Sequence, residues 1–73
     1  MMSGRVAGTI LEVHPYEVHG QRNWLVRWRP DGAPGGAVKE ARLAAESMPP
    51  DPVPGERVQV DLLMGEATEM RRA

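Results

Sequence analysis

The stretch NWLVRWRP, residues 23–30, holds both tryptophans of the chain and two of its arginines. In an extended strand alternate side chains point to opposite faces, so Trp24, Val26 and Trp28 share one face. The other face carries Leu25 and the two arginines. The chain has no phenylalanine and one tyrosine, so large core-forming side chains are scarce and the Trp-Val-Trp face is the predicted core face. The alternative is that both tryptophans are exposed and stack against a ligand.

The length and the cysteine count limit how this protein is stabilised. A chain of 73 residues is one small domain, which buries only about 60% of the surface that its unfolded chain exposes. There is no cysteine, so neither a disulfide nor a thiolate zinc site stabilises the fold. We expect a single domain over residues 3–70, with flexible termini at residues 1–2 and 71–73.

The segment before the tryptophans predicts a first strand. Residues 5–14, RVAGTILEVH, are rich in β-branched and aliphatic side chains. Gly8 inside this segment predicts a bulge or a sharp bend. Pro15 interrupts the pattern, and residues 16–18 continue it as an edge. After a turn, residues 23–29 are expected to pair with the first strand as an antiparallel hairpin.

The segment after the tryptophans has two interpretations. Residues 30–36, PDGAPGG, form a loop. Residues 37–48, AVKEARLAAESM, have apolar side chains at helical spacing and a composition that favours helix. The two glycines before this segment supply no helix cap, however. In addition, the predicted hairpin of residues 5–14 and 23–29 needs a third strand to be stable. We therefore favour a strand over residues 37–43, followed by one helical turn.

The last third of the chain predicts a connector and two further strands. Residues 49–55, PPDPVPG, contain four prolines and cannot form a helix or a central strand. Residues 56–63 alternate as a strand, Gly65 ends it, and residues 67–70 add a short edge strand. The predicted fold class is mostly β: a small, bent, single-domain β-barrel, SH3-like or OB-like, that has room for a short helix within 37–48.

Three quoted segments carry a resemblance to a known group of proteins. GTILEV (8–13), WLVRWRPDG (24–32) and PGERVQV (54–60) are similar to strands of short actinobacterial proteins of unknown function that have an SH3-like β-barrel. In those proteins the strand that corresponds to PGERVQV comes before the LVRW strand, whereas here it follows it. The resemblance implies a barrel fold and no catalytic residues.

The charge is near zero overall but unevenly distributed. The net charge is −1, which disfavours general nucleic-acid binding. Residues 20–45 carry five basic and two acidic side chains, and residues 46–73 carry three basic and six acidic ones. A basic contact face is therefore predicted from the first of these segments. Its candidate binding residues are Arg22, Arg27, Arg29 and Lys39.

The chain offers little of what nucleophilic catalysis requires. There is no cysteine, and its serines, Ser3 and Ser47, lie in the N-terminal tail and just before the prolines. No spacing typical of a catalytic triad is present, and the GAPGG loop lacks the lysine and hydroxyl residue of a phosphate-binding loop. We therefore expect no enzymatic activity and no cofactor.

A metal site is a further alternative that depends on two histidines. His14 and His19 lie close together in the sequence, each two residues after a glutamate. Imidazole and carboxylate groups are suitable ligands for zinc and other first-row metals. A closed site needs three or four convergent ligands, so the main prediction contains no metal.

The predicted function is a non-catalytic binding or assembly module, with a protein partner or self-association, because a thin core and open strand edges favour such contacts. The alternatives are single-stranded nucleic-acid binding by a small barrel and metal binding through the two histidines. No small-molecule substrate is expected.

No apolar run approaches the length of a membrane span and no signal peptide is visible. We expect a cytoplasmic protein of a bacterium or its phage, because a bias to Arg, Ala, Gly and Pro is typical of GC-rich genomes.

Overall fold

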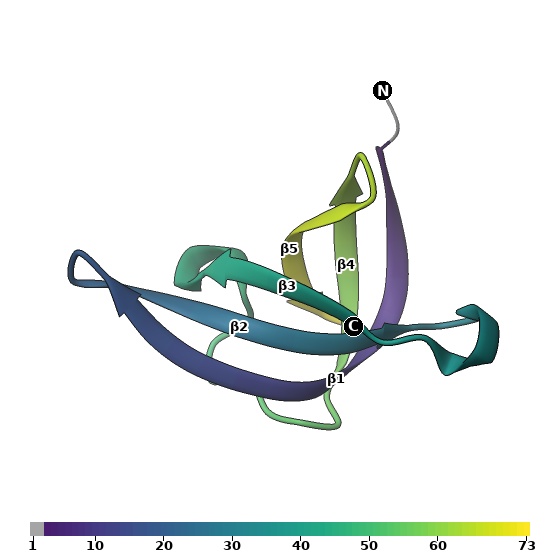
Figure 1. Ribbon diagram of the computed structural model, residues 1–73, viewed down its shortest axis with the longest axis horizontal. Coiled ribbons are helices and arrows are strands. Elements are labelled where there is room, and N and C mark those ends of the chain that lie inside the picture. Colours follow the sequence, from purple (N-terminus) through teal and green to yellow (C-terminus); the bar gives the residue numbers. More distant parts are fainter. Residues whose placement is uncertain (1–2) are drawn as a thin grey trace.

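The computed structural model describes residues 3–73, which form one bent sheet. In chain order the elements are β1 (Ser3–Val18), β2 (Gln21–Pro30), the 3₁₀ helix η1 (Pro34–Gly36), β3 (Lys39–Ala44), the 3₁₀ helix η2 (Ala45–Ser47), β4 (Arg57–Leu63) and β5 (Glu66–Arg72). All paired strands are antiparallel, in the order β3-β2-β1-β4-β5. The sheet curls so that β5 lies behind β3 (Figure 1). The predicted mostly β, bent, barrel-like domain is confirmed, although no ladder between β3 and β5 closes the described sheet.

The long strand β1 belongs to both halves of the bent sheet. Its residues 3–9 pair with β4, and its residues 8–18 pair with β2. The β1–β2 register shifts between Ile10 and Glu12, and such a bulge bends a strand and increases its twist. Gly8 lies where the two pairings overlap. The bulge is therefore near the predicted glycine but not at it: it lies between Ile10 and Glu12, where β1 passes from one half of the sheet to the other.

The core occupies the inner face of the bent sheet. Its buried apolar side chains come from every strand and from the segment after η2; they are Ile10, Val26, Trp28, Ala41, Leu43, Met48, Val58, Val60 and Met70. Trp28 is the largest of them and is 1% exposed. Truncating a buried tryptophan to alanine typically costs about 3–5 kcal/mol, so this side chain is a main source of stability. The core assignment of Val26 and Trp28 is confirmed.

Trp24 is only partly buried, which corrects its assignment to the core. It lies opposite Leu43 on the inner face and packs against the margin of the core. The Arg22 guanidinium carbon is 5.9 Å from the centroid of its ring, within cation–π range. The β1–β2 hairpin extends past the rest of the sheet (Figure 1), so less protein covers a side chain near its tip.

The ambiguous segment 37–48 contains a strand followed by a short helix, and the alternative of one helix over the whole segment is wrong. β3 pairs with β2 so that Ala41 faces Val26 and Leu43 faces Trp24. Both β3 residues are buried, and their exposed neighbours point outward. Alternate burial thus overrides the helical propensity of the composition. The single helical turn that follows is η2.

The C-terminal hairpin is longer than its sequence predicts. β4 agrees with the predicted strand 56–63, but β5 extends from Glu66 to Arg72 instead of covering 67–70. Residues 71 and 72 therefore belong to the sheet and not to a flexible tail. The Arg72 side chain forms an ion pair with Glu56 and donates a hydrogen bond to the carbonyl of Pro50. The predicted flexible residues 1–2 lie outside the described part of the chain.

Candidate binding groove

Three strands bring one row of outward side chains together. In the ladders, His14 of β1 lies opposite Leu25 of β2, which lies opposite Arg42 of β3. Directly paired residues point to the same face of a sheet. Because their neighbours Val26 and Ala41 point into the core, these three side chains lie on the outer face.

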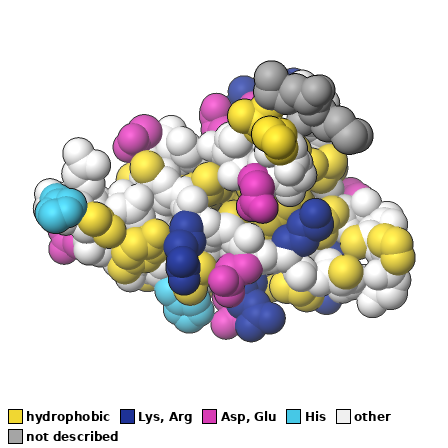
Figure 2. Space-filling model, turned by 45° about the horizontal axis from the view of Figure 1, so that its top comes forward, with side chains coloured by type: hydrophobic (Ala, Val, Ile, Leu, Met, Phe, Trp, Pro, Cys, Tyr) yellow, Lys and Arg dark blue, Asp and Glu magenta, His cyan; other side chains and the backbone are white. Residues whose placement is uncertain are grey.

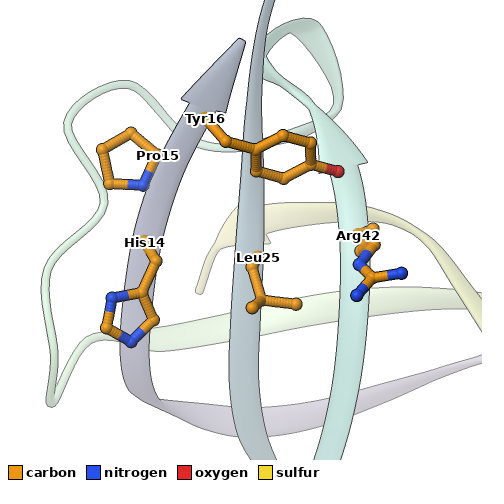
Figure 3. A pocket seen from close by; sticks show the side chains of 5 residues that line it. All are labelled: His14, Pro15, Tyr16, Leu25 and Arg42. Carbon is orange, nitrogen blue, oxygen red and sulfur yellow. The ribbon is translucent and has the colours of Figure 1, made fainter. Parts of the chain in front are cut away.

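This row forms the centre of a surface groove. The groove has a volume of about 430 Å³ and is lined by His14, Pro15, Tyr16, Leu25 and Arg42. Figure 3 shows Leu25 in the middle, between His14 on one side and Arg42 on the other. The ring of Tyr16 reaches across β2, with its hydroxyl directed toward β3 (Figure 3). The groove thus offers an apolar centre, two rings and one guanidinium group.

The charges beside the groove are partly compensated. In the adjacent row, a carboxylate oxygen of Glu12 is 3.6 Å from Arg27 Nη1 and the other is 3.4 Å from His14 Nε2. Arg27 also lies opposite Glu40 in the β2–β3 ladder. Among residues 3–73, no carboxylate lies within ion-pair distance of the Arg42 guanidinium. Arg42 is therefore the cation of the groove that is available to a ligand.

The predicted basic residues do not form one contact face. Arg27 and Arg29 point outward from β2, as expected. Arg29 lies beside the 30–36 loop, where its Nε donates a 3.1 Å hydrogen bond to the carbonyl of Gly36. Arg22 lies over the ring of Trp24 on the opposite side of the hairpin.

Lys39 is also separate from the other three basic residues. It is exposed at the beginning of β3, opposite the buried Trp28. It lines a hollow between β3 and β5 instead of the groove. The predicted set Arg22, Arg27, Arg29 and Lys39 is thus distributed over at least three places on the surface.

The groove residues that sequence reasoning missed are Tyr16, Leu25 and Arg42. The alternation of β1 indicates that His14 and Tyr16 share a face, and this signal was available in the sequence. Their proximity to Arg42 depends on the register of β2 with β3. Arg42 lies 17 residues after Leu25, in a segment whose sequence pattern is ambiguous between strand and helix. Local patterning carries no information about that register.

The structure does not bring the two histidines together as metal ligands. His14 lies within β1, whereas His19 lies in the β1–β2 turn with a φ of 50°. Five residues of extended strand separate their backbones by roughly 16 Å. Within residues 3–73, no group of three or more His, Cys, Asp or Glu side chains is placed to hold a metal ion.

The other half of the sheet, formed by the start of β1 with β4 and β5, has an outer face on which arginines are paired with carboxylates. Arg5 Nε is 2.9 Å and Arg71 Nη2 is 3.1 Å from Asp61 Oδ1. At the beginning of β4, Arg57 donates two hydrogen bonds to Asp31, at 2.7 and 2.6 Å. These hydrogen bonds hold the pKa of Asp31 below its usual range. Most of the charges on this face thus have partners within the protein.

Comparisons with protein-family models, with curated proteins and with solved structures give no match to this chain. Over residues 3–73 the structure has no helix long and apolar enough to cross a membrane.

Proposed function

We propose that this protein is a non-catalytic binding module that holds a segment of a protein partner in the groove between β1 and β3. The observation that carries the proposal is the unpaired guanidinium of Arg42 beside the apolar centre formed by Leu25 and Tyr16. Interaction surfaces are enriched in tyrosine and arginine, because both combine apolar contact with directional hydrogen bonding.

The composition of the groove supports binding in preference to catalysis. Its lining residues provide ring faces, apolar contact and one permanent cation. Within the described chain, no serine, threonine, lysine or carboxylate lines it. A nucleophile paired with a general base, which acyl transfer requires, is therefore not part of this groove.

The charges around the groove favour a protein partner over a polyanion. The adjacent row alternates in sign, with Glu12, Arg27 and Glu40 on successive strands. Figure 2 likewise shows acidic and basic side chains interspersed on the face that it presents. Protein surfaces carry charges of both signs, whereas a nucleic-acid backbone requires a continuous positive field.

Selection from a phage-displayed library of random dodecapeptides tests the proposal. The enriched peptides should bind the wild-type protein and lose at least about tenfold in affinity, or about 1.4 kcal/mol, with Leu25→Glu. The matched control is Gln59→Glu, which adds the same charge to β4, away from the groove. It should leave binding unchanged. Failure to enrich any peptide, or equal loss with both variants, contradicts the proposal.

Single-stranded nucleic-acid binding is a second candidate, which the strand order favours. A five-stranded, partly open barrel in which β1 pairs with both β2 and β4 is similar to the OB-fold. OB-folds bind oligonucleotides on the face of their second and third strands, where the groove lies here. Tyr16 and His14 offer rings for base stacking.

Fluorescence anisotropy with a labelled oligothymidine tests this second candidate. Binding that weakens steeply with added salt and is lost with Tyr16→Ala would support it. Gln59→Glu again serves as the control. No change in anisotropy at low ionic strength would eliminate it.

A further inference from the structure

A second hollow adjoins the groove at Arg42, on the open side of the sheet. This hollow of about 320 Å³ lies between the edges of β3 and β5 and is lined by Glu40, Ala41, Arg42, Glu66 and Ala67. Arg42 lines both this hollow and the groove. The two depressions therefore adjoin at Arg42 and together reach from β1 across β2 and β3 to β5. We call the pair of depressions the cross-strand track.

The cross-strand track has three chemically distinct parts. Its β1 end is apolar and aromatic, with Tyr16 and Leu25. Arg42 marks its middle, and Glu40 of β3 and Glu66 of β5 line the part beyond Arg42. In the described chain neither carboxylate has an ion-pair partner. Lys39 lines an adjoining hollow of about 230 Å³ that shares Glu40, Glu66 and Ala67 with this part of the track. Within residues 3–73 Lys39 forms no ion pair with either carboxylate.

The next inference rests on the proposed function. We infer that the ligand is an extended peptide with an apolar residue, an acidic residue and a basic residue in that spatial order. The apolar side chain packs on Leu25 beside the Tyr16 ring. The acidic side chain pairs with the Arg42 guanidinium, and the basic one lies between Glu40 and Glu66. The charges of such a segment complement those of the track at each position, which favours one direction of binding.

The dimensions of the track set the spacing within the peptide. Leu25 of β2 and Arg42 of β3 are directly paired on neighbouring strands, which are about 4.8 Å apart, and the open side beyond β3 adds a second distance of about this size. An extended peptide advances about 3.3 Å per residue. Successive contacts are therefore placed two positions apart, with one residue between them, and a pentapeptide of the pattern apolar-x-acidic-x-basic covers the track.

The acidic end also determines which class of ligand the track excludes. A nucleic-acid strand that follows the track would bring phosphates toward Glu40 and Glu66. Like charges placed opposite each other at an interface are unfavourable. The track therefore favours a peptide over an oligonucleotide on the same face.

Titration of the ¹⁵N-labelled protein with synthetic pentapeptides tests this inference. The probes are acetylated and amidated LSESK, its charge-exchanged isomer LSKSE, and LSESS, which lacks the basic residue. LSESK should bind about tenfold more tightly than LSKSE and shift amide signals along β1, β2, β3 and β5. Glu66→Gln should weaken LSESK about threefold, which is the range of an exposed ion pair, and leave LSESS unchanged.

Charge variants of the protein provide the matched controls. Arg42→Glu should abolish the preference for LSESK over LSKSE, whereas Arg5→Glu, on the opposite half of the sheet, should preserve it. Equal affinity for all three peptides, lost with Leu25→Glu, would overturn the inferred charge order and leave the proposed function intact. Absence of binding by every probe overturns the inference too. The proposed function fails separately if the random library yields no groove-dependent peptide.

Discussion

The ring of Trp28 packs directly on Gly8, at the point where β1 passes from one half of the sheet to the other. A Cβ atom built on Gly8 would lie 2.8 Å from Trp28 Cε3 and 2.8 Å from the carbonyl oxygen of Arg29. The second of these contacts is with backbone, which cannot move aside without disturbing the β1–β2 ladder. The absence of a side chain at Gly8 therefore allows Trp28 to pack against β1 at this point.

Gly8→Ala should destabilise the protein by about 1–3 kcal/mol, the usual cost of overpacking a core. Urea unfolding followed by tryptophan fluorescence measures this difference. Gly4→Ala is the matched control, because no atom lies within 4 Å of the Cβ that it would add on the same strand. Equal stability of the two variants would contradict the close packing of β1 on Trp28.

The two tryptophans should differ in their access to solvent. Trp28 is 1% exposed and Trp24 is only partly buried, so Trp24→Phe leaves a protein whose emission is blue-shifted and resistant to iodide. Trp28→Phe leaves Trp24 as the fluorophore, with emission at longer wavelength and measurable quenching. Circular dichroism of both variants checks that they are folded. Equal quenching of the two would contradict the assigned positions.

The β4–β5 turn should become more stable when its methionine is replaced. Met64 has a φ of 53°, is 73% exposed and is followed by Gly65 with a φ of 82°. Left-handed backbone costs most residues about 1–2 kcal/mol, and asparagine before glycine is preferred in such turns. Met64→Asn should therefore raise the melting temperature by roughly 4–8 °C for each kcal/mol gained. A lower melting temperature would show that Met64 makes stabilising contacts.

The pairing of Asp31 with Arg57 should make stability depend on pH in the acid range. Hydrogen bonds from Arg57 lower the pKa of Asp31 in the folded state, so the stabilisation is complete above the pKa of the unfolded chain, about 3.9. It is lost as the pH falls through the lower pKa of the folded state, because protonation removes the pairing. The stability difference between wild type and Asp31→Asn should thus shrink below about pH 4.

Urea titrations at several pH values measure this difference. Glu46→Gln is the control, because within the described residues Glu46 has no ion-pair partner. Its stability difference from wild type should vary much less with pH. A difference for Asp31→Asn that stays constant from neutral pH to pH 3 would contradict a role for the ionised pair.

Local patterning of the sequence determined most of the strands. The alternation of Trp24, Val26 and Trp28 identified the inward face of β2, because residues two apart in a strand share a face. The prolines of residues 49–55 marked a break, because proline lacks the backbone donor that a central strand needs. The shortage of other large apolar residues indicated that Trp28 lies in the core. Each of these conclusions depends on a few neighbouring residues.

The tertiary structure alone decided which distant residues meet. The groove places His14, Leu25 and Arg42 in one row through two ladders, and a shift of one residue in either ladder would turn one of them to the other face. The 37–48 segment became a strand because Ala41 and Leu43 fill the core, although its composition favours a helix. The predicted basic residues are divided for a different, local reason: Arg22 shares a face of β2 with Trp24, whereas Arg27 points to the other face. Register and burial arise from packing between segments far apart in the chain, which local patterning does not specify.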